Sequence, residues 1–201
     1  MTKGRMKSAL LPTAFALALA MLPAAAPADD VIYLDDSVLL GGGDGEAFRE
    51  PCPEDWALTG VTVTMGENMN SISPVCSAPN PGDDDDTTQL GTYGYAKDRP
   101  GVASCYPNPV LGMEVSTSAA NVVHHLQLTC GSPDGETHLA IITTADGAGP
   151  LTPGGTAQRT ERTDCPPGAF AVGLYGRYGQ LVDAVGLMCG TVAAAQPQNG
   201  D

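Results

Sequence analysis

The chain has few large aromatic residues and few basic ones. It contains one Trp and three Phe among 201 residues, and aromatic residues make up only 5% of the composition. Because large aromatic side chains contribute much of a typical core, we expect a light core that needs other support. Nine Lys and Arg stand against 23 Asp and Glu. An acidic surface of this kind repels phosphate backbones and anionic lipid, so nucleic acid and membrane surfaces are poor partners.

A helical pattern is also missing. No segment beyond the amino-terminal region has a sustained 3.6-residue apolar period, and none is long enough to cross a bilayer. Amphipathic helices show that period, and membrane helices need about 20 apolar residues. We therefore expect an all-β protein without membrane insertion.

Motifs for catalysis and metal binding are absent as well. The sequence has neither a Gly-x-Ser-x-Gly nor a His-Glu-x-x-His motif. His124 and His125 are neighbours in an expected strand and so point to opposite faces. The acidic run Asp83–Asp86 lacks the spaced ligands of a calcium loop and is interpreted as a solvated loop. We predict no enzyme activity, no metal and no cofactor.

The amino terminus predicts export. Lys3, Arg5 and Lys7 precede an apolar run over 9–22, and Ala26-Pro27-Ala28 follows. This order of features is typical of a signal peptide over 1–28, and the apolar run is too short to span a bilayer. Cleavage leaves six Lys and Arg against 23 Asp and Glu, a net charge of −17. We expect a secreted or periplasmic protein.

All six cysteines lie in the exported part, where the compartment permits disulfides. Six cysteines allow about 15 pairings, but an internal repeat selects one set of three. The repeat predicts a bond across each of three segments of nearly equal length, namely Cys52 with Cys76, Cys105 with Cys130, and Cys165 with Cys189. Each bond closes a loop of about 25 residues and contributes roughly 3 kcal/mol in the chain-entropy model.

The first and third Cys-bounded segments align without a gap. Both open with Cys-Pro, and the aligned positions that carry the repeat are Gly60 with Gly173, Gly66 with Gly179, and Asn70 with Asp183. The second segment keeps the cysteines and an early glycine, Gly112, but has two extra residues before its closing Cys. Three related units therefore build the chain.

Each unit is expected to form a pair of strands. Apolar residues alternate on both sides of a central loop, which is the period-2 pattern of half-buried strands. They are Phe170, Val172, Leu174, Val185, Leu187 and Cys189 in unit three, and Leu111, Met113, Val115, Leu126, Leu128 and Cys130 in unit two. A further strand precedes each first cysteine, and 31–34 can pair as an edge or closing strand.

These patterns predict a single domain over 29–194, with repeats at about 41–76, 91–130 and 154–190 and a flexible tail over 195–201. Gly-rich segments precede each first cysteine, at Gly41-Gly42-Gly43, at Gly91 and Gly94, and at Gly154-Gly155. Such glycines indicate tight loops where a backbone or a ligand approaches closely. We expect three small antiparallel sheets, stapled by disulfides, around a pseudo-threefold axis.

The stretch 173–186, GLYGRYGQLVDAVG, resembles the carboxy-terminal region of jacalin-related lectins, which have the β-prism I fold. The three Cys-bounded units are similar to those of the vitelline membrane outer-layer protein, which shares that fold. The resemblance covers most of the exported chain as repeat architecture, and about 20 residues as a motif. It implies a β-prism.

The lectin resemblance also implies a sugar site on a Gly-x-x-x-Asp loop. Gly179 begins the loop, the backbone amides of Gln180 and Leu181 face sugar hydroxyls, and Asp183 accepts hydrogen bonds from two hydroxyls. Beside this loop, Gly154 and Gly155 are the nearest match for a glycine-pair wall, and Tyr175 and Tyr178 could stack on a sugar face. Gly66 and Asn70 offer a weaker second site, since an amide accepts through only one oxygen.

Three functions stay open. The first is a secreted carbohydrate-binding or surface-interaction module. About four or five hydrogen bonds of ~1 kcal/mol each give an affinity near millimolar, so adhesion needs several sites or an oligomer. The second is a structural extracellular or envelope protein that binds a protein partner, in which Gly179 only turns a hairpin and Asp183 hydrogen-bonds its own loop. The third is a glycan-processing enzyme.

Overall fold

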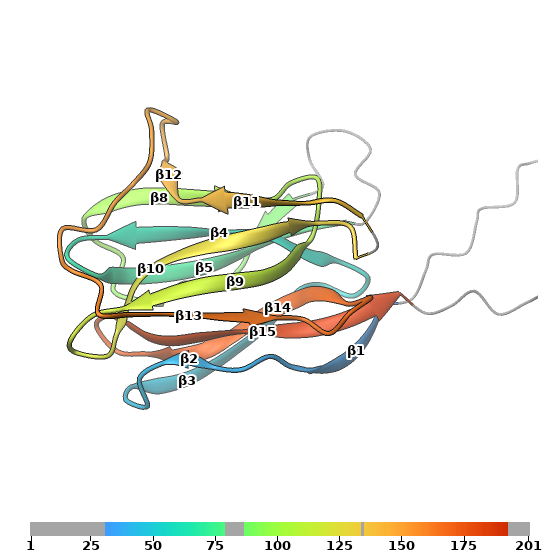
Figure 1. Ribbon diagram of the computed structural model, residues 1–201, viewed down its shortest axis with the longest axis horizontal. Coiled ribbons are helices and arrows are strands. Elements are labelled where there is room, and N and C mark those ends of the chain that lie inside the picture. The colour runs from blue at the N-terminus through green and yellow to red at the C-terminus, as the bar shows by residue number, and fades with distance from the viewer. Residues whose placement is uncertain (1–30, 79–86, 134, 193–201) are drawn as a thin grey trace, which may run out of the picture.

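The computed structural model describes residues 31–78, 87–133 and 135–192. The expected signal peptide, the tail over 195–201 and the run Asp83–Asp86 lie outside these residues. In the described part of the chain, all assigned secondary-structure elements are β-strands (Figure 1). No helix of the described part is long and apolar enough to cross a membrane.

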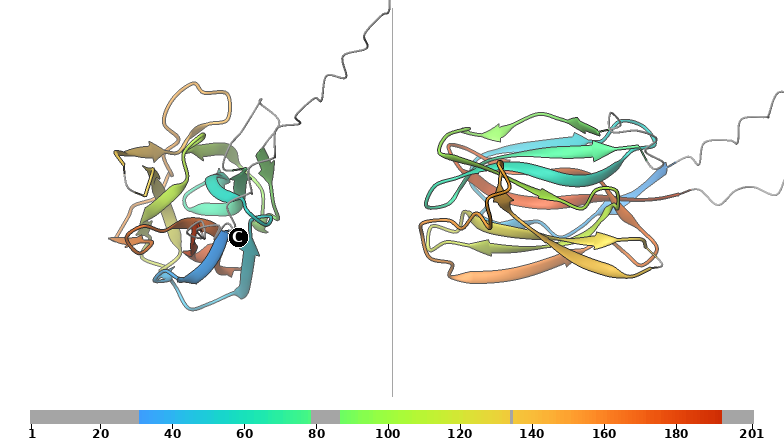
Figure 2. Two further views of the ribbon diagram at one scale, coloured as in Figure 1. Left: turned by 90° about the vertical axis from the view of Figure 1, so that its right-hand side faces the viewer. Right: turned by 90° about the horizontal axis from the view of Figure 1, so that it is seen from above.

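The strands form three antiparallel sheets around one axis (Figures 1 and 2). Sheet A contains β1 (Val31–Asp36), β15 (Val182–Val192), β14 (Phe170–Tyr178) and β3 (Glu46–Pro51), with β2 (Leu40–Gly41) paired to β15. Sheet B contains β12 (Thr143–Thr144), β8 (Arg99–Ser104), β4 (Ala57–Met65), β5 (Met69–Ser77) and β6 (Thr87–Gln89), with β7 (Tyr93–Gly94) paired to β5. Sheet C contains β11 (Thr137–Ile141), β10 (Val123–Gly131), β9 (Val110–Thr117) and β13 (Arg159–Asp164). The fold is an all-β prism, as predicted.

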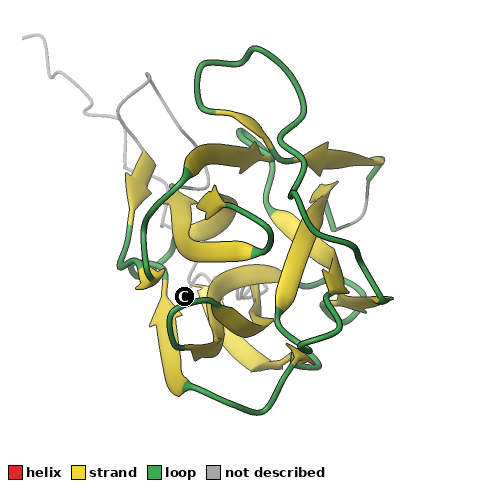
Figure 3. Cartoon of the chain, turned by 90° about the vertical axis from the view of Figure 1, so that its left-hand side faces the viewer, coloured by secondary structure: helices red, strands yellow, loops and turns green. Residues whose placement is uncertain are grey.

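The three predicted disulfides are confirmed. They join Cys52 with Cys76, Cys105 with Cys130, and Cys165 with Cys189. Each connects the segment before one central strand to the end of its hairpin partner. The disulfides lie at the opposite end of the prism from the hairpin turns. Figure 3 looks onto the end that carries the hairpin turns. They supplement a main core of mostly aliphatic side chains contributed by all three sheets.

The predicted alternation fails at one place in units two and three. In β14, Ala171 and Leu174 face the main core, whereas Phe170 and Val172 join a small cluster outside it. The register shifts between Ala171 and Gly173, which marks a bulge. A bulge adds a residue and so exchanges the faces of the side chains on either side of it. Leu111 in β9 is displaced in the same way.

The repeated early glycine follows this bulge in every unit. Registers shift just before Gly60, Gly112 and Gly173. A Cβ at Gly60 would come within 2.6 Å of the Ala103 carbonyl, and one at Gly173 within 2.6 Å of the Glu50 carbonyl. A side chain at these positions would collide with the neighbouring strand. The repeated glycine is therefore architectural.

The strand before each first cysteine belongs to another unit's sheet. β3 pairs with β14 of unit three, β8 with β4 of unit one, and β13 with β9 of unit two. β1 pairs with β15 at the edge of sheet A, which confirms the predicted closing strand. The amino-terminal segment therefore completes the sheet of the carboxy-terminal unit, and this exchange decides which loops meet.

Candidate functional site

The Gly-x-x-x-Asp loop is the turn between β14 and β15. The Gly179 N–H donates to the Leu181 carbonyl at 2.9 Å, which closes a tight turn. The backbone N–H groups of Gln180 and Leu181 donate no hydrogen bond within the described residues. Two donors at the tip of the turn are therefore available to a ligand.

A glycine-rich loop lies against this turn, but it is Gly41–Gly45, between β2 and β3. The Gly42 N–H donates to the Asp183 carbonyl at 2.8 Å. Arg177 in β14 holds the far side of the loop, since its guanidinium donates to the Asp44 carbonyl at 2.8 Å and the Gly45 carbonyl at 2.7 Å. Sequence reasoning did not assign this loop to the site, although its glycine run is visible in the sequence.

The prediction that Gly154 and Gly155 form this wall is wrong. Their N–H groups donate instead to the carbonyls of Gly66 and Glu67, at 2.9 and 3.1 Å, in unit one. Both glycines precede Cys165 of unit three in the chain. Strand exchange makes the loop before each cysteine a neighbour of a different unit, so Gly41–Gly45 meets the turn of unit three.

Asp183 is mostly buried as a residue, but its carboxylate oxygens reach solvent and have no internal partner. The residue is 9% exposed, and its side chain accepts no hydrogen bond from any described residue. Burial, together with the negative charge of Asp44, raises the pKa of Asp183 above its usual value, and Arg177 opposes this effect. Buried polar groups are nearly always hydrogen-bonded. This carboxylate therefore needs water or a ligand as its donor.

Glycines leave space around that carboxylate. A Cβ at Gly45 would collide with Asp183 Oδ2, and one at Gly179 would lie 3.6 Å from the same oxygen. A Cβ at Gly43 would meet no heavy atom within 4 Å. Two positions without side chains, Gly45 and Gly179, border the acceptor and leave room for a hydroxyl-bearing ligand.

The second predicted site is closed by the protein itself. Asn70 is 3% exposed, and its amide donates to the Lys97 carbonyl at 3.2 Å and to Asp98 Oδ2 at 2.6 Å. A Cβ at Gly66 would lie 2.8 Å from that same carboxylate oxygen. The Asn70 amide, predicted to form a weak second site with Gly66, is therefore already bound within the fold.

The Gly179–Asp183 and Gly66–Asn70 loops occupy equivalent positions in units three and one. The residues that differ between the two units therefore explain why Asp183 is open and Asn70 is closed. Gly41 and Gly94 each approach the carbonyl of the loop's fifth residue, Asp183 or Asn70. Four residues later stand Gly45 in one unit and Asp98 in the other, both with positive φ, 76° and 67°. Asp tolerates this conformation better than most residues. Because unit three has Gly45 where unit one has Asp98, the Asp183 carboxylate stays without a side-chain partner, whereas Asn70 is bonded to Asp98.

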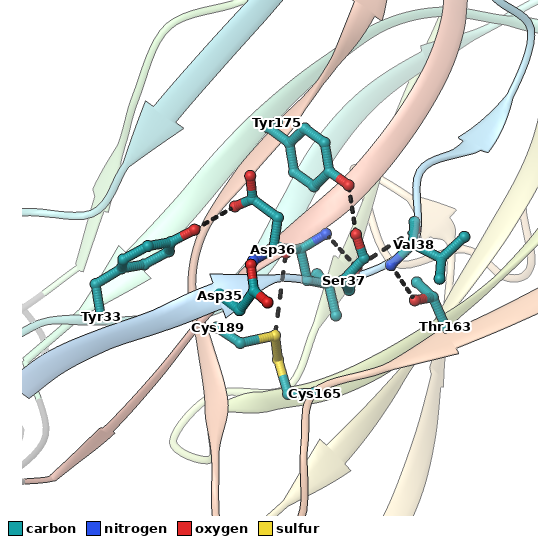
Figure 4. The surroundings of a disulfide bond; sticks show 10 residues. Tyr33, Asp35, Asp36, Ser37, Val38, Thr163, Cys165, Tyr175 and Cys189 are labelled. Carbon is teal, nitrogen blue, oxygen red and sulfur yellow. Dashed lines mark hydrogen bonds between the residues drawn. A yellow bond between two sulfur atoms is a disulfide. The ribbon is translucent and has the colours of Figure 1, made fainter.

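The two tyrosines predicted to stack on a sugar are used inside the fold. The Tyr175 hydroxyl donates to the Ser37 carbonyl (Figure 4), and a Cβ at Gly186 would collide with the Tyr175 ring. Tyr178 packs against the main core, with its ring centroid 5.4 Å from that of Tyr93 and 6.1 Å from that of Phe48. Neither ring is free to stack on a sugar.

The exposed ring near the turn belongs to Tyr95, which is 62% exposed. It lies beside a pocket of about 330 Å³ at the boundary of sheets A and B. The residues that line this pocket are Gly94, Tyr95, Lys97, Gly179 and Gln180. The turn of unit three therefore borders an open hollow on this side.

No protein-family model matches the chain, and no curated protein matches it by sequence. Solved structures of jacalin-related lectins share its fold. Wild-type Malaysian banana lectin matches with a TM-score of 0.54 and 16% identity, over 79% of this chain and 99% of the lectin. AcmJRL, a mannose-binding jacalin-related lectin from Ananas comosus, matches with 0.51 and 18%, over 81% and 99%. Artocarpin, in complex with mannotriose, matches with 0.52 and 18%, over 77% and 97%.

These matches confirm the β-prism I fold. At such low identity they speak for the fold alone. The resemblance of the Cys-bounded units to the vitelline membrane outer-layer protein stays a prediction.

Proposed function

We propose that the protein is an exported, non-enzymatic glycan-binding module with one sugar site, formed by the Gly179–Asp183 turn and the Gly41–Gly45 loop. The observation that carries the proposal is the Asp183 carboxylate, which accepts no hydrogen bond from the described residues although the residue is only 9% exposed. The equivalent Asn70 is satisfied internally. A sugar hydroxyl can donate to this carboxylate and accept from the unused amides of Gln180 and Leu181.

The lectin-like fold also supports glycan binding. The matched structures include a mannose-binding lectin and a lectin in complex with mannotriose. Fold alone does not establish function, so the proposal depends on the turn and not on the likeness. A neutral sugar of the hexose class fits a site whose polar groups are one carboxylate and several amides.

The test is a glycan array followed by titration calorimetry with the strongest ligand. Asp183→Ala is expected to weaken binding at least tenfold, since hydrogen bonds to a charged acceptor contribute about 1.5–3 kcal/mol each. Asp146→Ala removes the same charge from an exposed turn and should leave binding unchanged. Circular dichroism must show that both variants are folded.

Equal binding by folded Asp183→Ala would refute the site. The alternative of a structural protein predicts no glycan binding and retention of a protein partner from the envelope. The alternative of a glycan-processing enzyme predicts release of reducing sugar from polysaccharides.

A further inference from the structure

The pocket beside the Gly179–Asp183 turn has an unusual charge for this protein. Acidic residues outnumber basic ones 23 to 9 in the chain, yet none of the five lining residues is Asp or Glu. The only charged side chain in the lining is Lys97. In a protein with so many acidic residues, a pocket whose only charged side chain is a lysine favours an anionic ligand.

Lys97 is also the one basic side chain of the described residues without an ion pair or a hydrogen bond. Arg49, Arg159 and Arg162 pair with carboxylates, and Arg99 and Arg177 donate to backbone carbonyls. The Lys97 ammonium lies 5.6 Å from the Tyr95 ring centroid, within reach of a cation–π interaction. The ring holds the ammonium at the pocket without consuming its three N–H donors.

A further donor is the side-chain NH2 group of Gln180, which lines the pocket. Carboxylate and sulfate groups only accept hydrogen bonds when ionised, and charged acceptors form the stronger bonds. The ammonium and this amide together match such a group better than they match a hydroxyl.

The two sides of the pocket are fixed relative to each other. Tyr178 directly precedes Gly179, and Tyr93 directly precedes Gly94, and the centroids of the two rings lie 5.4 Å apart. Phe48 stacks on Tyr93 with centroids 4.1 Å apart. This cluster joins sheet A to sheet B, so a ligand meets a preformed hollow and little ordering is required.

We propose that this pocket is a second subsite that takes an anionic sugar residue, bearing a carboxylate or a sulfate, next to the sugar held at Asp183. The inference rests on the proposed function and names its substrate class as acidic oligosaccharides. The overall negative charge does not prevent this, since charges beyond about 8 Å are screened at physiological salt while contact with Lys97 is direct.

The test uses an array of neutral mannan, glucan and galactan oligosaccharides, each beside its uronate and sulfated counterparts. The wild-type protein should prefer a charged member over its neutral counterpart by about two- to fivefold, the range for a partly exposed ion pair. Lys97→Met should abolish that preference and leave neutral ligands bound, whereas Lys97→Arg should keep it. Arg159→Met, which removes an equal charge in sheet C, should change nothing.

The outcomes separate the two proposals. Binding that depends on Asp183 but ignores charge, or that survives Lys97→Met with its charge preference intact, overturns the subsite alone. Failure to bind any glycan, neutral or charged, overturns the proposed function and the subsite with it. Preference for the uronate and not the sulfate, or the reverse, identifies the group that the pocket takes.

Discussion

Asp183, the residue proposed to bind the sugar, is expected to cost stability. The residue is mostly buried, and its pKa is raised by that burial and by the charge of Asp44. A carboxylate kept only for folding would have an internal donor, as the Asn70 amide donates to Asp98. A carboxylate without an internal donor agrees with the general observation that functional residues lower the stability of a fold.

Asp183→Asn should therefore raise the free energy of unfolding at pH 7 while weakening glycan binding. The raised pKa means that the folded protein favours the protonated carboxyl. The contribution of Asp183 to stability is full below 3.8, the pKa expected in the unfolded chain, and is lost as pH rises through the folded pKa. Urea unfolding of both proteins from pH 7 downward should show the gap closing toward pH 3.8. Equal stabilities at pH 7 would contradict this.

At the scale of elements, strand exchange decides which loops form the site. The glycine run at Gly41, the turn at Gly179 and the closing strand at 31–34 are all visible in the sequence. Gly154 and Gly155 are nearer to the turn in the chain but lie beside unit one. The pairing of β3 with β14 brings Gly41–Gly45 beside Asp183, and no pattern in the sequence specifies that pairing.

The exchange between Gly45 and Asp98 can be tested by one substitution. A Cβ at Gly45 would collide with Asp183 Oδ2 and lie 2.6 Å from the Tyr178 carbonyl, so Gly45→Asn should displace the Gly41–Gly45 loop and fill the space beside the Asp183 carboxylate. We expect its glycan affinity to fall at least tenfold by calorimetry, and circular dichroism checks that the variant is folded. Gly147→Asn is the matched control, since Gly147 has a φ of 72° and open space around its Cβ. Undiminished binding by folded Gly45→Asn would mean that the ligand does not occupy this hollow.

Much of the fold could be predicted because the repeat supplied three copies of each signal. Disulfide pairing, the all-β class and the three sheets all depend on features that recur at fixed offsets. The bulges could not be predicted, since one extra residue in a strand leaves the composition unchanged while it moves Phe170 and Leu111 to another face. The closure at Asn70 was missed because its partner, Asp98, lies 28 residues away along the chain.

At the scale of the whole molecule, the prism contains three architectural repeats, but only unit three carries the proposed sugar site. Units one and three present equivalent turns at one end of the prism, and only the turn of unit three retains an open acceptor. Unit two has a longer turn, in which the Ser118 N–H donates to the Val122 carbonyl. One chain is therefore expected to bind one glycan, and higher avidity requires several chains.

The most direct test of this account is amide chemical-shift mapping of the ¹⁵N-labelled protein titrated with a glycan selected on the array. The account predicts a single cluster of shifted resonances, centred on Gln180, Leu181 and Gly42–Gly45, with the amides around Asn70 unmoved. Shifts that spare Gln180 and Leu181 and gather elsewhere on the prism would contradict it.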